Sequence, residues 1–90
     1  MNKKQSSKQT FSVKAPGADH VQLVGDFTDW QKSPITMTKL DGGLWQTTIA
    51  LEQGVYHYRF LVDGAWRDDP ECTIRVTNPY GSENAVRHVA

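Results

Sequence analysis

Residues 55–62 read VYHYRFLV, the longest run of alternating side chains in this chain, and Asp63-Gly64 follows as a hairpin-turn dipeptide. Successive side chains on a strand point to opposite faces, so every second residue shares a face. One face carries a bulky, largely aromatic set that we expect in a core: Tyr56, Tyr58, Phe60 and Val62. Arg59 then lies on the opposite, more polar face. Because the turn brings Trp66 back beside this strand, we expect the arginine and the indole on one outer surface.

The rest of the chain repeats this period of two in shorter stretches and has no sustained helical pattern. Further candidate strands lie around residues 11–14, 21–23, 35–40, 45–51, 74–76 and 85–89. Trp45 shares a face with Ile49 and Leu51, so it is predicted to be buried. Gly, Pro and Asp turn signals separate these stretches at intervals of roughly 8–12 residues. The pattern predicts an all-β antiparallel sandwich.

Composition limits the functions that this chain can have. Ten basic and ten acidic residues give a formal net charge of zero, without the positive excess that nucleic-acid binding uses. The chain contains no run of about 18 apolar residues that would span a bilayer, and its start, MNKKQSSKQ, lacks the apolar segment of a secretory signal. The single Cys72 has no partner for an internal disulfide. We therefore expect a cytoplasmic protein that binds neither nucleic acid nor membrane.

The chain is predicted to hold one domain after a short lead-in. Residues 1–9 are polar and rich in lysine without any periodicity, which predicts a flexible N-terminal segment. Ninety residues bury enough surface for one modest core. We therefore expect residues 10–90 to form a single β-sandwich module.

A second exposed indole is predicted in the loop GDFTDW, residues 25–30. A loop of this kind commonly turns one ring inward and leaves the other at the surface. Trp30 is followed by polar residues 31–33 and is interpreted as the outward ring, with Phe27 as the inward one. Small domains rarely leave wide apolar patches uncovered, so two indoles on one face indicate a ligand. The alternative is that each indole is a partly buried plug at one end of the sandwich.

A glucose ring is a physical match for such a surface. Its axial C–H groups form an apolar face that an indole can cover, and its hydroxyls can pair with an arginine at the rim. If each indole removes on the order of 100 Å² from water, two indoles contribute about 5 kcal/mol at about 25 cal/mol/Å². The dissociation constant for a short glucan is then expected in the high-micromolar to millimolar range.

These motifs resemble a known family. GDFTDW followed by a Pro, then GVYHYRFLVDGAWRDDP, is similar to the family 48 carbohydrate-binding modules, and the similarity runs over about residues 21–89. That family includes the glycogen-binding domain of the AMP-activated protein kinase beta subunit and the amino-terminal modules of branching and isoamylase-type enzymes. The resemblance implies an immunoglobulin-like antiparallel β-sandwich of the early-set type and an alpha-glucan ligand such as glycogen or starch. It also suggests a glycogen-metabolising enzyme or a kinase, encoded elsewhere, as a second partner.

The resemblance implies five carbohydrate-binding residues: Trp30, Arg59, Trp66, Tyr80 and Asn84. The two tryptophans correspond to the sugar platforms of the family, and Arg59 stands where the family has a lysine that hydrogen-bonds the sugar. Tyr80 replaces a hydrophobic loop residue, and Asn84 matches an asparagine that contacts hydroxyls. Structural alternatives are an ion pair for Arg59 and a turn position for Asn84. Tyr80 would then be a loop ring lying on Pro79.

No catalytic or metal site is predicted. A glycosidase needs two carboxyl groups facing each other, about 5–5.5 or 6.5–9.5 Å apart, and adjacent strand residues such as Asp68 and Asp69 point to opposite faces. The three histidines lack metal-ligand spacing with Cys72, and no phosphate-binding glycine loop is present. We expect a non-catalytic module without metal or cofactor. The alternative is an immunoglobulin-like regulatory domain that dimerises or docks on a protein and has no sugar ligand.

Overall fold

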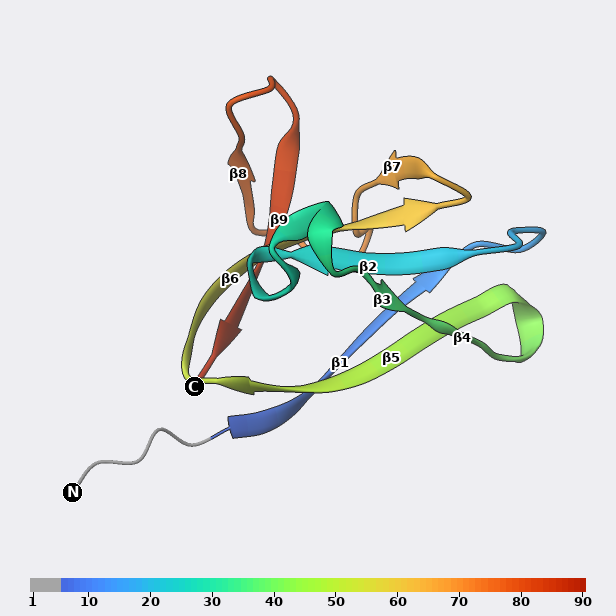
Figure 1. Cartoon of the computed structure of the whole chain (residues 1–90), viewed down its shortest axis with the longest axis horizontal. Helices are drawn as coiled ribbons and strands as arrows, with labels where there is room; N and C mark the ends of the chain where they lie inside the picture. Colours follow the sequence, from blue (N-terminus) through green and yellow to red (C-terminus); the bar gives the residue numbers. More distant parts are fainter. Residues whose placement is uncertain (1–5) are drawn as a thin grey trace.

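The computed structural model describes residues 6–90, which form two antiparallel sheets with a shared core (Figure 1). The strands are β1 (Ser6–Lys14), β2 (Val21–Gly25), β3 (Ile35–Thr36), β4 (Thr38–Lys39), β5 (Leu44–Glu52), β6 (Gly54–Val62), β7 (Ala65–Arg67), β8 (Arg75–Thr77) and β9 (Glu83–Val89). Short 3₁₀ helices lie in the connections: η1 (Asp26–Thr28), η2 (Trp30–Lys32) and η3 (Asp41–Gly43). One sheet has the order β1-β5-β4. The six-stranded sheet has the order β3-β2-β6-β9-β8, and β7 also pairs with β6.

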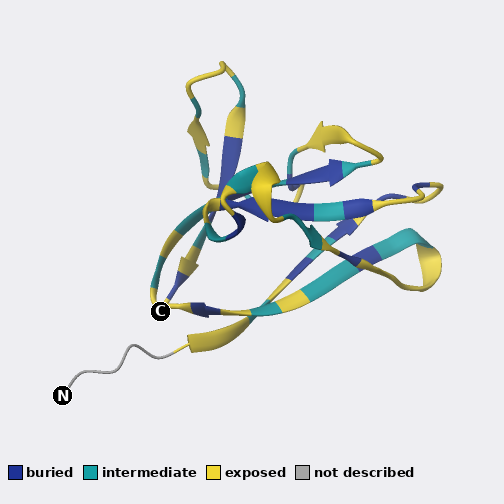
Figure 2. Ribbon diagram, viewed as in Figure 1, coloured by how far each residue is buried: buried dark blue, intermediate teal, exposed yellow. Residues whose placement is uncertain are grey.

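The core lies between the two sheets, where the buried segments of the ribbon face each other (Figure 2). Its largest members are Phe11 and Trp45 from the three-stranded sheet and Leu23, Tyr58 and Phe60 from the six-stranded sheet. Tyr58 meets Phe11 edge to face, with ring centroids 4.8 Å apart. The bulky set predicted from the alternation in β6 therefore faces inward, and Trp45 is buried as predicted. The antiparallel sandwich is confirmed.

Residues 35–40 do not form the single strand that the sequence suggested. β3 pairs with β2 in the six-stranded sheet, whereas β4 pairs with β5 in the three-stranded sheet. Between them Met37 is buried, and its N–H donates to the Val21 carbonyl at 2.9 Å. The chain crosses from one sheet to the other at this residue. Neither half is long enough to establish a period.

The first strand begins earlier than expected, so the boundary of the flexible segment at residue 9 is wrong for residues 6–9. β1 starts at Ser6, and Ser6 pairs with Glu52 at the far end of the β1–β5 ladder. Gln9 also accepts a hydrogen bond from Arg87 Nη1 at 3.1 Å. Residues 6–10 are polar, and a backbone ladder needs no alternation of side chains, so composition alone concealed this strand. Residues 1–5 of the expected segment lie outside the described residues.

The β6–β7 hairpin turn is fixed to the rest of the domain by Asp63. Asp63 and Gly64 have φ angles of 51° and 82°, as a tight turn of two left-handed residues requires. The Asp63 carboxylate accepts hydrogen bonds from the backbone N–H groups of Asp19 and His20 at 2.9 and 2.7 Å. The aspartate that the sequence assigned to the turn therefore also ties it to the β1–β2 connection, and this fixes the hairpin that carries Trp66.

Candidate functional site

Three of the five expected site residues lie on one face of the six-stranded sheet, the face turned away from the three-stranded sheet. We call it the outer face. Arg59 pairs with Val24 across β6 and β2, Trp66 pairs with Leu61, and Asn84 alternates with the inward-facing Ala85. Directly paired residues of antiparallel strands point to the same side. The alternation in residues 55–62 therefore predicted correctly that Arg59 and Trp66 share a surface.

Trp66 and Arg59 contact each other on this face. The Trp66 residue is 44% exposed, and the guanidinium carbon of Arg59 lies 5.0 Å from the centroid of its ring. This is the distance of a cation–π interaction. Leu61, opposite Trp66, is buried although it does not belong to the core cluster between the sheets. The indole therefore rests on the sheet and still offers an open surface to solvent.

Arg59 is held in place by a carboxylate. Asp68 Oδ1 accepts from Arg59 Nε at 3.1 Å and lies 3.0 Å from Nη2. The other oxygen of Asp68 lies 3.3 Å from Arg75 Nη1, so Asp68 bridges two guanidinium groups. The ion pair considered as the structural role of Arg59 is present, and it coexists with the cation–π contact with Trp66. The sequence pattern did not identify Asp68 or Arg75 as members of this group.

The GDFTDW loop turns its phenylalanine inward, as predicted. The Phe27 ring packs against the rings of Phe11 and Tyr56, with centroids 5.8 and 5.9 Å away. Gly25 lets the loop approach β6, because a Cβ there would lie 2.5 Å from the His57 carbonyl oxygen. The carboxylate of Asp26 accepts the His57 N–H at 2.8 Å. The loop is thus fastened to β6.

Trp30 is half-buried and is held by its backbone. Asp29 and Trp30 have φ angles of 52° and 56°, in the left-handed region that bulky residues rarely adopt. The buried Thr28 hydroxyl lies 2.7 Å from the Trp30 carbonyl oxygen and accepts the Gly25 N–H at 3.0 Å. Two left-handed residues in succession persist only where neighbouring contacts fix them. Thr28, which no motif in the sequence marked, supplies such contacts.

Tyr80 is 92% exposed at the tip of the β8–β9 loop. Asn78 organises this loop: its Oδ1 accepts the N–H groups of Tyr80 and Ser82 at 3.0 and 3.2 Å. Its Nδ2 donates to Asn84 Oδ1 at 3.1 Å. Asn84 lies in β9 rather than in a turn, and it is only 6% exposed. Little of the Asn84 side chain is therefore open to a ligand, and its contact supports the loop that presents Tyr80.

The segment after β7 is anchored in the core by Asp69. The Tyr58 hydroxyl donates to Asp69 Oδ2 at 2.6 Å, and the Glu71 N–H donates to Asp69 Oδ1 at 3.0 Å. Burial, together with this hydrogen bond to a carboxylate, raises the pKa of Tyr58 far above its usual range. The carboxylates of Asp68 and Asp69 have separate partners, one on the outer face and one in the core. This agrees with the expectation that the two side chains point to opposite faces.

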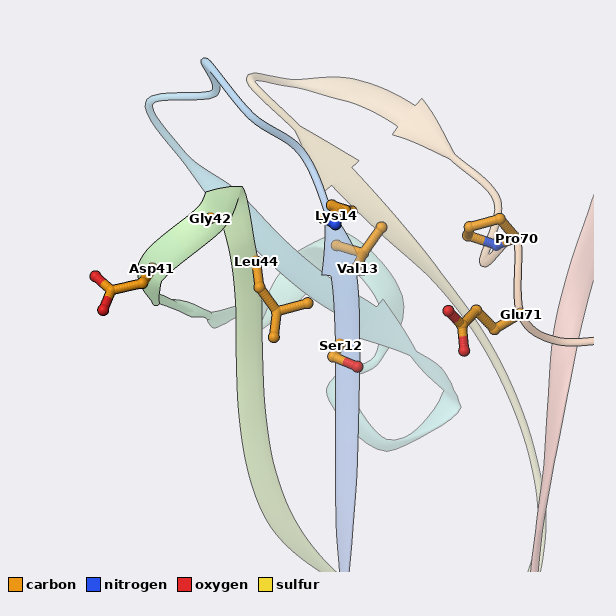
Figure 3. A pocket seen from close by; sticks show the side chains of 8 residues that line it. All are labelled: Ser12, Val13, Lys14, Asp41, Gly42, Leu44, Pro70 and Glu71. Atoms are coloured by element: carbon orange, nitrogen blue, oxygen red, sulfur yellow. The ribbon is translucent and has the colours of Figure 1, made fainter.

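Two hollows of about 310 Å³ each border β1, away from the Trp66–Arg59 contact. The first is lined by Ser12, Val13, Lys14, Asp41, Gly42, Leu44, Pro70 and Glu71 (Figure 3). These lining residues include no aromatic ring, so this hollow lacks the flat apolar surface that a sugar ring covers. The second includes Tyr58, whose hydroxyl already pairs with Asp69. The candidate site is therefore the outer face rather than a hollow.

Within residues 6–90, no helix is long and apolar enough to cross a membrane. The same residues contain no group of three or more His, Cys, Asp or Glu side chains placed to hold a metal ion.

Comparison with known proteins gives a consistent set of relatives. Residues 8–90 match the family described as the glycogen recognition site of AMP-activated protein kinase. The chain is 39% identical over 77 residues to a 1,4-alpha-glucan branching enzyme of Deinococcus radiodurans, covering 86% of this chain and 10% of the enzyme. It is 34% identical over 73 residues to the beta-1 subunit of 5'-AMP-activated protein kinase from Sus scrofa, covering 81% of this chain and 57% of the subunit.

A solved structure shares the fold. The crystal structure of a pullulanase from Anoxybacillus superposes with a TM-score of 0.61 at 26% identity, covering 94% of this chain and 13% of the pullulanase chain. The chain thus spans about a tenth of the branching enzyme and just over half of the kinase subunit. The immunoglobulin-like sandwich implied by the resemblance is confirmed.

Proposed function

This chain belongs to the family described as the glycogen recognition site of AMP-activated protein kinase, and on that premise we propose that it is a non-catalytic module that binds alpha-1,4-linked glucans such as glycogen or starch. The observation that carries the proposal is the half-exposed Trp66 indole with the Arg59 guanidinium 5.0 Å from its ring centroid. The apolar face of a glucose unit stacks on the open side of the indole, and Arg59 donates to the hydroxyls at the edge of that sugar.

The other expected residues extend this contact. Trp30, on the loop that follows β2, provides the second platform, and Tyr80 approaches the glucan from the β8–β9 loop. We assign Asn84 a supporting role, because it is buried and holds Asn78, which in turn holds the backbone of Tyr80. Each glucose unit is recognised by a flat apolar side chain and a few polar groups. The affinity of a single module is therefore in the high-micromolar to millimolar range, and several modules on one polymer bind more tightly.

The proposal includes no reaction. Asp68 is engaged by two arginines and Asp69 is buried against Tyr58, so the pair does not flank a glycosidic bond. We propose a cytoplasmic location, where the module holds a glycogen-metabolising enzyme or a kinase close to its glucan. Relatives named as a branching enzyme and a kinase subunit support this role.

Electrophoresis through native gels with and without glycogen tests the proposal. We expect the wild type to be retarded by glycogen and Trp66→Ala to migrate almost as it does without glycogen. Leu40→Ala is the matched control: it also truncates an exposed apolar residue, one next to β4 in the other sheet, and it should be retarded like the wild type. Equal mobility of the wild type in both gels would refute glucan binding.

Light scattering and indole fluorescence separate this function from the rival one. A protein-interaction domain would use the same aromatic residues to form a dimer or to bind a protein. We expect a monomer whose indole fluorescence changes on addition of maltoheptaose. A dimer that protects Trp30 and Trp66 from a fluorescence quencher and ignores maltoheptaose would establish the rival.

A further inference from the structure

Asp68 is a charged residue next to Arg59 that has no role among the expected sugar contacts. Its side chain is 41% exposed, and both of its oxygens face guanidinium groups, those of Arg59 and Arg75. Asp68 therefore lies next to the Trp66–Arg59 contact, where its carboxylate can set the orientation of the Arg59 guanidinium.

We propose that Asp68 is a positioning residue of the glucan site: it fixes the Arg59 guanidinium against the Trp66 indole, and Arg75 fixes Asp68. The inference rests on the proposed glucan binding. A guanidinium has five N–H donors in a rigid plane. Asp68 Oδ1 engages one on Nε and one on Nη2, so three are not taken by Asp68, and 13% of the Arg59 side chain is exposed. The carboxylate thus selects the orientation of Arg59 without using up its donors.

Arg75 makes this arrangement rigid. Its Nη2 donates to the Asp69 carbonyl at 2.8 Å and its Nε to the Cys72 carbonyl at 3.3 Å, while Nη1 faces Asp68. One side chain therefore ties the carboxylate of Asp68 to the backbone of the segment that follows it. Asp69 holds the same segment in the core through Tyr58. A group that is ordered before the ligand arrives loses less conformational entropy on binding.

The geometry also explains why the residue beside Trp66 is an arginine. A planar guanidinium can lie over an indole and hold a carboxylate through two adjacent N–H groups at the same time. An ammonium group is a point charge on a flexible stem and cannot fix its orientation in this way. Asp68 and Arg59 therefore act as one unit, and the effect of removing one depends on the presence of the other.

The first test measures the position of Arg59 without any ligand. In ¹⁵N spectra of the full chain, the Arg59 Nε–H should exchange with water several-fold faster in Asp68→Asn than in the wild type. Asp41→Asn, which removes the same charge at a turn next to the three-stranded sheet, should leave this rate unchanged. An unchanged rate in Asp68→Asn would overturn the inference, whatever the protein binds.

The second test is a double-mutant cycle with maltoheptaose. We expect Asp68→Asn to weaken binding about three- to tenfold and Arg75→Gln about twofold, with folding checked by thermal denaturation. In an Arg59→Gln background, Asp68→Asn should have no further effect, because Asp68 acts through Arg59.

Each outcome of the cycle decides one point. Equal losses from Asp68→Asn in both backgrounds would mean that Asp68 contacts the sugar itself. If Asp68→Asn binds maltoheptaose as tightly as the wild type or more tightly, Asp68 only competes with the sugar for Arg59. Either result refutes this inference and leaves the proposed function standing. A wild type that does not bind maltoheptaose refutes the proposed function and this inference together.

Discussion

The two tryptophans that we propose as sugar platforms are held in different ways. Trp66 lies on a strand, and its surroundings are set by side chains on the sheet surface: Leu61 opposite it, and Arg59 held by Asp68. Trp30 lies in a loop with left-handed backbone, fixed by hydrogen bonds to a buried hydroxyl and by the close approach of a glycine to β6. The position of Trp66 therefore depends on surface charge, whereas that of Trp30 depends on buried packing. Substitutions of the residues that hold the two tryptophans should reveal this difference, because they should affect mainly affinity around Trp66 and mainly stability around Trp30.

Gly25→Ala should give the largest effect. The φ angle of Gly25 is 179°, which any residue adopts, so the cost is steric: the new Cβ would lie 2.5 Å from the His57 carbonyl oxygen and 3.0 Å from Tyr58 Cβ. Both contacts are with the centre of β6. We expect the free energy of unfolding, measured by urea denaturation, to fall by about 3 kcal/mol.

Gly64→Ala is the matched substitution, in the turn of the β6–β7 hairpin that carries Trp66. A Cβ there meets nothing within 4 Å, but the φ angle of 82° is in the left-handed region. The loss should be about 1 kcal/mol, from backbone strain alone. Equal losses for the two glycines would contradict the idea that the Trp30 loop depends on close packing.

Trp66→Ala and Trp30→Ala should each reduce glucan affinity. Removing one platform costs about 2 kcal/mol of binding free energy, which is roughly thirtyfold in the dissociation constant for maltoheptaose. Trp66→Ala should cost more than Trp30→Ala, because it also removes the ring over which Arg59 lies. Chemical-shift titration measures both constants. An affinity unchanged by Trp30→Ala would mean that this half-buried ring is a plug rather than a platform.

The sequence predicted those parts of the structure that follow from local alternation. The inward set of β6, the burial of Trp45 and the common surface of Arg59 and Trp66 all rest on the period of two in one strand or one hairpin. The crossing at Met37 interrupts any period, and the polar start of β1 has none. These features depend on pairing between distant segments, which alternation does not report.

The supporting residues of the site were not predictable for a related reason. Asp68 meets Arg59 across a hairpin, and Asn78 meets Asn84 across another. Polar side chains such as these are common in turns, so their presence in a sequence does not reveal which partner they reach. Thr28 carried the best available signal, since a threonine three residues after a loop glycine can cap the turn. The two tryptophans were recognisable from their residue type, whereas the groups that hold them were recognisable only from contacts.

Thr28→Val should have an intermediate effect that is confined to the Trp30 loop. Valine keeps the shape of threonine but leaves the Gly25 N–H without its buried acceptor and removes the contact with the Trp30 carbonyl. We expect a loss of about 1.5 kcal/mol in the free energy of unfolding. In ¹⁵N spectra the indole N–H signal of Trp30 should shift or broaden while that of Trp66 stays in place. Thr28→Ser should restore most of the stability, and a shift of both indole signals would contradict separate support of the two platforms.

Arg59→Lys should give the smallest effect, and it should appear in affinity rather than stability. A lysine keeps the positive charge beside Asp68 but cannot lie flat over the indole while engaging the carboxylate through two donors. We expect maltoheptaose to bind about threefold more weakly, with the free energy of unfolding within about 0.5 kcal/mol of the wild type. In a Trp66→Ala background the same substitution should change the affinity by less than about 1.5-fold, because the indole ring that interacts more favourably with a planar cation is absent. A threefold loss in both backgrounds would mean that Arg59 binds the glucan independently of Trp66, and the contact between the two would then be a consequence of the fold rather than the basis of the site.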